Sequence, residues 1–214
     1  TLSQIDSSIG GKVAINLDEV KNIVGAFYQP KMVFIDPDTL QTLPRRHYIN
    51  GLIEALKAGL IYDASLFALF EQGDIEKDLD TIIEKALYVK KSVVEQDERE
   101  QGLRKILNFG HTIGHAIESY YHLSEYLHGE CVALGMLYFI DDEQLKQRVI
   151  SVYERLGIRT HVDFDSEAVY QLLCRDKKAD GDHVTIVHVP KVGTAQLIET
   201  PLHEVRTILK GTSA

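Results

Sequence analysis

The sequence is short of the residues and runs that mark several protein classes. It has only two cysteines in 214 residues, Cys131 and Cys174, and they form no C-x-x-C motif. This argues against a disulfide framework or a thiolate zinc site and suits a reducing cytoplasm. No apolar run approaches the roughly 20 residues that cross a bilayer, so no membrane association is expected. With a formal net charge of −9, a broad nucleic-acid surface is not expected either.

Three familiar site motifs are also missing. A P-loop at "DSSIGGKV" would need glycine at position 6 and serine or threonine at position 13, where Asp6 and Val13 stand. No G-x-G-x-x-G occurs, and the metalloprotease motif H-E-x-x-H is absent because Thr112 follows His111. In so acidic a chain, any bound anion must be held by a local group of lysines and arginines.

What is present predicts a mainly α fold. A hydrophobic content of 44% and a charged content of 26% are typical of globular proteins. Apolar spacing predicts helices over residues 46–62, 78–96, 108–121, from about 128, 143–156, 166–173 and 204–209. "KMVFID" (31–36) predicts a buried strand ended by the turn "DPD", and "HVTIVHVP" and "TAQLIE" around "KVG" predict a β-hairpin near the C-terminus.

The stretch "ILNFGHTIGHAIES" sets His111 and His115 four residues apart. On a helix these two imidazoles share one face, with Asn108 on the adjoining surface. Gly110 and Gly114 each cost a helix roughly 1 kcal/mol relative to alanine, so a packing or binding reason for them is expected. Two packed core histidines are the alternative to a metal or substrate site.

A metal site would need a further ligand from elsewhere in the chain. "LHGECVALGM" places His128 and Glu130 at a predicted helix start, and "INGLIEALKAG" places Glu54 and Lys57 on an earlier helix. Zinc takes histidine and carboxylate ligands and, when catalytic, leaves a position open. A helix cap for His128 and a surface charge for Glu54 are the alternatives.

Basic residues for an anion occur in several segments. Lysine supplies a point charge and arginine a bidentate contact to phosphate or carboxylate. Solvated surface charges are the alternative for each of them. The candidates are Lys12, Lys90, Arg104, Lys177 and Lys178, with Asp6, Glu100 and Asn108 beside them in the sequence.

The order of the motifs resembles a known family. "DSSIGGK", "KNIVGAFYQP", "TLP", "NGLIEALK", "DEREQGLRKILNFGHTIGHAIE", "HGECVALGM" and "DKK" follow one another along essentially the whole chain. In this order they resemble 3-dehydroquinate synthase, and "LNFGHTIGHAIE" with "HGE" is highly specific for that family and its sugar-phosphate cyclase relatives. The resemblance implies a multihelical C-terminal domain of that family. It also implies conversion of 3-deoxy-arabino-heptulosonate 7-phosphate to 3-dehydroquinate and phosphate in the shikimate pathway, with NAD and Zn2+ or Co2+.

The resemblance also implies residue roles. Glu54, His111 and His128 would bind the metal, so His115 would lie beside the substrate and, with Glu100, assist proton movement. The remaining catalytic positions are Lys57, Arg104 and Asn108; the substrate positions are Asp6, Lys12, Asn22, Lys90 and one of Lys177 and Lys178; the NAD positions are Lys12, Lys21, Thr39 and Thr42.

In that family an N-terminal α/β domain precedes the "DSSIGGK" turn and carries a glycine-rich loop under the NAD pyrophosphate. We therefore expect residues 1–45 to be a remnant of the NAD-domain junction, with this turn and one strand. Residues 46–214 are expected to form the helical metal- and substrate-binding domain, as a fragment or one half of a split protein. Its expected partners are the NAD domain, a sugar phosphate and, as is typical of the family, a second copy. Alone, the chain is expected to bind zinc but to have weak or no NAD affinity and negligible turnover.

Three alternatives remain open from the sequence. A 2-deoxy-scyllo-inosose synthase-like cyclase would share the cofactors. A metal-dependent polyol dehydrogenase would not need the basic residues of "DEREQGLR". A non-catalytic, metal-stabilised helical module that binds a partner domain would keep the ligands without binding substrate.

Overall fold

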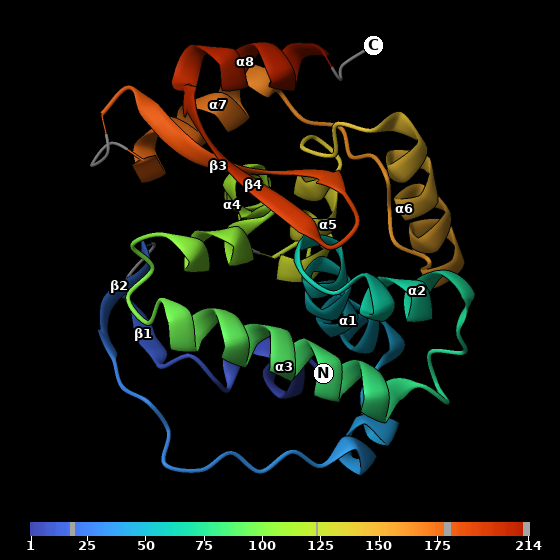
Figure 1. Ribbon diagram of the computed structural model, residues 1–214. Coiled ribbons are helices and arrows are strands. Elements are labelled where there is room, and N and C mark those ends of the chain that lie inside the picture. Colours follow the sequence, from blue (N-terminus) through green and yellow to red (C-terminus); the bar gives the residue numbers. More distant parts are fainter. Residues whose placement is uncertain (18–19, 123, 178–180, 212–214) are drawn as a thin grey trace.

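The computed structural model describes residues 1–17, 20–122, 124–177 and 181–211, without the side chains of 16–23 and 176–177. Helices build the body, and two separate antiparallel hairpins lie on it (Figure 1). The mainly α fold is thus confirmed. In chain order the elements are the π-helical turn η1 (Ser3–Ser7), β1 (Lys12–Leu17), β2 (Val20–Phe27), the 3₁₀ helix η2 (Pro37–Thr42), α1 (Arg45–Ile61), α2 (Ala64–Gln72), α3 (Leu79–Gln96), the 3₁₀ helix η3 (Leu103–Asn108), α4 (His111–Tyr120), α5 (His128–Met136), α6 (Glu143–Leu156), α7 (Ser166–Lys177), β3 (His183–Lys191), β4 (Thr194–Pro201) and α8 (Leu202–Gly211).

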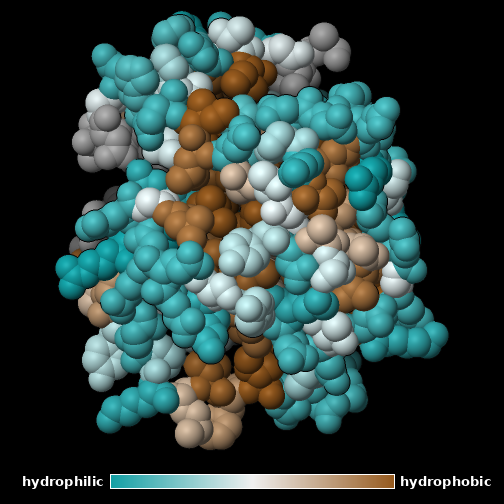
Figure 2. Space-filling model, viewed as in Figure 1, coloured by the Kyte–Doolittle hydropathy of each residue, from teal (hydrophilic) through white to brown (hydrophobic). Residues whose placement is uncertain are grey.

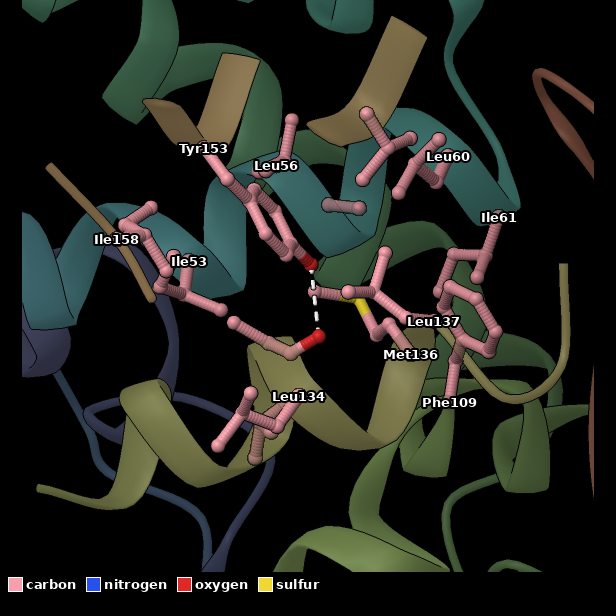
Figure 3. Packing of buried hydrophobic residues seen from close by; sticks show 14 of the residues in the cluster. Ile53, Leu56, Leu60, Ile61, Phe109, Leu134, Met136, Leu137, Tyr153 and Ile158 are labelled. Carbon is pink, nitrogen blue, oxygen red and sulfur yellow. Dashed lines mark hydrogen bonds between the residues drawn. The ribbon is translucent and has the colours of Figure 1, made fainter. Parts of the chain in front are cut away.

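Helix α1 is the centre of the core and is buried along nearly its whole length. A helix covered on all sides in this way must be packed by several elements, and α1 contacts α2, α3, α5 and η1. Figure 3 shows Ile53 and Leu56 of α1 beside Tyr153 of α6. The Tyr153 hydroxyl donates to the carbonyl of Ala133 in α5 at 2.9 Å, so this buried polar group has a partner.

The predicted helices are confirmed, with small changes at their ends. Helix α6 has the predicted bounds because Asp142 caps its start, accepting from the amide of Leu145 at 2.7 Å, and Gly157 ends it with φ of +73°. Helix α7 continues beyond the predicted residue 173. Helix α4 begins at His111 because Gly110, with φ of +77°, separates it from η3. The hairpin β3–β4 is confirmed as well.

The strand predicted over residues 31–36 is wrong. This segment has no regular structure, and Met32 and Phe34 are 69% and 88% exposed, although the prediction placed it in the core. A strand needs a neighbouring strand for its backbone hydrogen bonds, and among the described residues none pairs with this segment. Asp36 instead caps η2, accepting from the amide of Asp38.

Besides the short helical turns, a hairpin and a helix were not predicted. One is the β1–β2 hairpin, in which Lys12 pairs with Phe27; the turn "DSSIGGK" leads into its first strand, with Gly10 and Gly11 at positive φ. Helix α2 was missed although Asp63 is a strong N-cap, accepting from the amides of Ser65 and Leu66.

Hydrophilic residues cover most of the face seen in Figure 2, and hydrophobic residues show mainly in a central band. Neither Cys131, which is buried, nor Cys174 forms a disulfide. Within the described ranges, every helix is too short or too polar to cross a bilayer.

Candidate metal and anion site

Glycines bring α4 and α5 into close contact. A Cβ on Gly135 would overlap the carbonyl of Gly110, and one on Gly114 would lie 2.9 Å from the carbonyl oxygen of Cys131. The sequence left packing and binding open for Gly110 and Gly114, and the structure shows packing. Since His111 begins α4 and His128 begins α5, this contact sets their ring centroids 5.2 Å apart.

Glu54 faces both of these histidines from the buried helix α1. Its Oε1 lies 3.8 Å from Nε2 of His111 and 3.9 Å from Nε2 of His128. Its Oε2 accepts from Nζ of Lys57, one turn further along α1. Within the described part of the chain, Oε1 is buried without a hydrogen-bond partner. A buried carboxylate oxygen without a partner is costly, which indicates that a positively charged group belongs beside it.

Contacts fix which nitrogen of His111 is free to bind a ligand. Its Nδ1 lies 3.1 Å from the carbonyl oxygen of Phe109; because a carbonyl only accepts, Nδ1 carries the hydrogen and the Nε2 lone pair points towards Glu54. Burial lowers the pKa of His111 well below its ordinary 6.5, and the positive charge of Lys57 acts in the same direction. His111 therefore stays neutral at pH 7, the form that binds metal.

The residues present fit a divalent cation. In a tetrahedral zinc site with bonds of about 2.1 Å, the ligand atoms lie about 3.4 Å apart, close to the separations of 3.8 and 3.9 Å between Glu54 and the two histidines. His111, His115 and His128 also offer ligand nitrogens that all lie within 4.8 Å of one another. Two ligand sets are thus possible, three histidines or Glu54 with His111 and His128. The unpartnered oxygen of Glu54 favours the second.

Two buried cations, Lys90 and Arg104, lie together at Gly10, and the charge of Lys90 also acts on Glu54. Lys90 of α3 pairs with Asp6, its Nζ lying 2.8 Å from Oδ1, and also donates to the Asp6 carbonyl at 2.7 Å. Arg104 of η3 is almost fully buried and donates to the carbonyls of Gly10, at 2.7 Å, and Glu98. Gly10 is required there, because a Cβ on it would lie 2.8 Å from Nη2 of Arg104.

Lys12 and Asn108 meet at Glu100, which accepts from both. Burial lowers the pKa of Lys12 to about 8, with the positive charges of Arg104 and Lys90 acting in the same direction. Positive charges crowded in this way favour an added anion. Lys12, Lys90 and Arg104, which come from distant segments of the chain, thus lie close enough for their charges to act on one another; their predicted roles in binding an anion stay predictions.

The structure describes the side chains of only some of the residues predicted to contact NAD and substrate. Thr39 and Thr42 lie on η2, where the Thr39 hydroxyl donates to the Asp36 carbonyl at 2.7 Å and accepts from Gln4 of η1 at 3.0 Å. Lys21 and Asn22 lie in β2, and Lys177 ends α7. The side chains of these three residues, and Lys178 as a whole, lie outside the described part of the structure. The roles predicted for all these residues stay predictions.

Two acidic residues lie beside the histidine group. Glu130, weighed from sequence beside His128, bonds Arg46 at 2.7 Å and the amide of Leu127 at 2.8 Å, so it caps α5. Glu118, which sequence reasoning passed over, lies 3.4 Å from Nδ1 of His128. The signal that could have found it was its place at the end of the "HTIGHAIE" motif, three residues after His115 on α4.

Two solved structures share this fold. The 2-deoxy-scyllo-inosose synthase complexed with carbaglucose-6-phosphate, NAD+ and Co2+ superimposes with a TM-score of 0.83 at 26% identity, over 98% of this chain and 64% of that one. The 2-epi-5-epi-valiolone synthase from Streptomyces hygroscopicus subsp. jinggangensis, solved with NAD+ and Zn2+, gives 0.80 at 26% identity, over 98% and 63%. The fold is therefore that of the sugar-phosphate cyclases.

Sequence comparison gives the particular family. The model of the 3-dehydroquinate synthase C-terminal region matches residues 51–179, and that of the N-terminal region matches residues 1–50. The 3-dehydroquinate synthase of Thermoanaerobacter pseudethanolicus is 42% identical over 98% of this chain, and that of Streptococcus suis is 40% identical over 97%. The chain belongs to the 3-dehydroquinate synthase family. It spans about 63% of the length of the first of these relatives and 62% of the second.

Proposed function

We propose that this chain is the metal- and substrate-binding part of a 3-dehydroquinate synthase, acting on 3-deoxy-arabino-heptulosonate 7-phosphate in the shikimate pathway of the cytoplasm. The observation that carries the proposal is the unpartnered Oε1 of Glu54, which faces His111 and His128. The buried cations beside it support a phosphorylated substrate. The identity of 42% to a curated synthase, against 26% to the two other cyclases, favours this substrate over theirs.

Glu54, His111 and His128 would hold Zn2+ or Co2+, and Lys12, Lys21, Thr39 and Thr42 would contact NAD. Bound together, the two cofactors supply polarisation of the substrate hydroxyls and a reversible hydride acceptor. Both neighbouring cyclases were solved with NAD+ and one of these metals. These residues fit a metal because Oε1 of Glu54 faces Nε2 of His111 and Nε2 of His128.

The chain's own residues would bind and orient the substrate. Lys90 and Arg104 are held by backbone carbonyls and by Asp6, so their positions are fixed before an anion arrives. Such preorganisation lets binding energy hold one conformer of a flexible sugar phosphate. Asp6, Lys12, Asn22, Lys57, Asn108 and one of Lys177 and Lys178 would complete the pocket, while His115 and Glu100 would move protons.

Exposed apolar side chains suggest where the rest of the protein fits. Residues 13–34 carry a cluster of them, and no other short stretch of the described chain exposes as many. We name this cluster the 13–34 surface: Val13, Ile15, Val24, Phe27, Tyr28, Met32 and Phe34. Exposed clusters of this kind mark interaction sites, and we propose that an NAD-binding domain covers this one. The division at residues 45 and 46, just where α1 begins, and the homodimer stay predictions.

The test fuses this chain to the portion of the Thermoanaerobacter pseudethanolicus relative that lies outside the match. We expect phosphate release from the heptulosonate phosphate, and negligible release by the chain alone or by the joined protein carrying His115→Ala. Release only from a hexose phosphate would instead identify a 2-deoxy-scyllo-inosose synthase-like enzyme. Zinc binding without release from either substrate would favour the non-catalytic module.

A further inference from the structure

The two histidines that face Glu54 are held in the same way, but by different groups. Each turns its Nε2 towards Oε1 of Glu54, at 3.8 and 3.9 Å. For His111 the opposite nitrogen is anchored by the carbonyl of Phe109. For His128 the opposite nitrogen, Nδ1, faces a carboxylate oxygen of Glu118 at 3.4 Å.

Glu118 is a carboxylate that the proposed reaction does not use. It lies on α4 and is only 5% exposed, and burying a carboxylate costs free energy unless it is paired and hydrogen-bonded. Because it faces Nδ1 of His128, it lies on the side of that ring away from Glu54. It is therefore badly placed to be a ligand of a metal at Nε2, and well placed to hold the ring.

We propose that Glu118 is a positioning residue: it accepts the Nδ1 hydrogen of His128 and so presents the Nε2 lone pair to the metal. The inference rests on the ligand set of the proposed function. An ionised carboxylate accepts only, so the pair fixes one tautomer of His128. The carboxylate also makes the imidazole a stronger donor, and loss of such a partner typically lowers metal affinity about 10- to 100-fold.

A merely structural role would have different consequences. Glu118 could instead link α4 to the start of α5, in which case its removal would change the stability of the fold rather than the affinity for metal. The variant Glu118→Gln separates the two roles, because the amide oxygen can still accept from Nδ1 but carries no charge. Glu71→Gln, which breaks a surface pair with Arg148, is the matched control.

The experiment is a zinc competition titration against a chromophoric chelator at pH 7, with thermal unfolding of each metal-free chain. We expect affinity to fall about 10-fold in Glu118→Gln and about 100-fold in Glu118→Ala, with Glu71→Gln at the wild-type value and the melting temperature of Glu118→Gln unchanged. In nitrogen NMR spectra, metal-free wild type should show His128 protonated on Nδ1, and Glu118→Ala should lose this preference.

Wild-type affinity in both Glu118 variants would overturn the inference while leaving the ligand set intact. A loss of affinity explained by loss of folded protein would overturn it as well. Absence of zinc binding in the folded wild-type chain would instead contradict the proposed function, and the inference with it.

Discussion

Lys57 donates to one oxygen of Glu54 from the next turn of α1 and leaves the other oxygen turned towards the two histidines. Both side chains are almost fully buried. Burial acts to raise the pKa of Glu54, but the charge and hydrogen bond of Lys57, with smaller contributions from His128 and Lys90, hold that pKa below its usual range. The carboxylate is therefore ionised at neutral pH, as a metal ligand has to be.

Removing Lys57 should leave the buried, ionised Glu54 without its ion-pair partner. Breaking a buried ion pair on one side typically costs about 3–5 kcal/mol, so Lys57→Ala should lower the free energy of unfolding in urea by about that amount. Added zinc should restore part of the loss, because a cation bound to the native chain stabilises it. The double variant Glu54→Gln with Lys57→Met should be more stable than Lys57→Ala and insensitive to zinc. If zinc raised the free energy of unfolding equally in Lys57→Ala and in the double variant, this would contradict an ionised Glu54 that binds metal.

The contact between α4 and α5 should depend on Gly135. A Cβ there would overlap the carbonyl of Gly110, so Gly135→Ala should push the helices apart and cost about 1–3 kcal/mol. Zinc affinity should fall too, since His111 and His128 begin these two helices. Gly211→Ala, where a Cβ would meet nothing within 4 Å, is the control. An unchanged zinc affinity in Gly135→Ala would show that the helix contact does not position the ligands.

Substitution of Gly10 by alanine should also destabilise the fold. Its φ of +96° disfavours any side chain, and a Cβ would also press on Arg104. Gly157 has φ of +73° with nothing nearby, so Gly157→Ala measures the backbone strain alone, about 1–3 kcal/mol. In urea unfolding, Gly10→Ala should cost more than Gly157→Ala, and it should weaken binding of inorganic phosphate. Equal costs would mean that Arg104 moves aside freely.

Asp97 should make the loop before η3 sensitive to acid. Its carboxylate accepts from the amides of Gly102, Gln101 and Arg104, and these hydrogen bonds hold its pKa below the ordinary 3.8. A lowered folded pKa means that the stabilisation is complete above about pH 3.8 and is lost as the pH falls through the folded value. Asp97→Asn should therefore show a flatter loss of stability below about pH 3.8 than wild type. Parallel acid unfolding curves would contradict this.

The elements that depend on local pattern could be predicted from the sequence. Helices α1, α3 and α6 follow apolar spacing, and the β3–β4 hairpin follows its alternation and turn. The segment 31–36 could not be predicted in this way, because a strand exists only with a partner and its apolar side chains lie exposed. Helix α2 was within reach through its cap, Asp63.

The site could be predicted only in part. Spacing paired His111 with His115, whereas the structure turns His111 and His128 together towards Glu54, a grouping that the family resemblance had named. Glu118 was not predicted because its partner, His128, lies on another helix, and local sequence spacing does not indicate a contact between two helices. The reason for Gly110 and Gly114 likewise lies in the close packing of α4 on α5, which the sequence alone does not indicate.

Zinc content of the purified chain tests the central claim most directly. The wild type should hold about one zinc per chain, lost in Glu54→Ala, His111→Ala and His128→Ala and retained in His115→Ala. Loss in His115→Ala with retention in Glu54→Ala would show that three histidines bind the metal and would contradict the proposed role of Glu54 as a ligand. A folded wild-type chain without zinc would contradict the site itself.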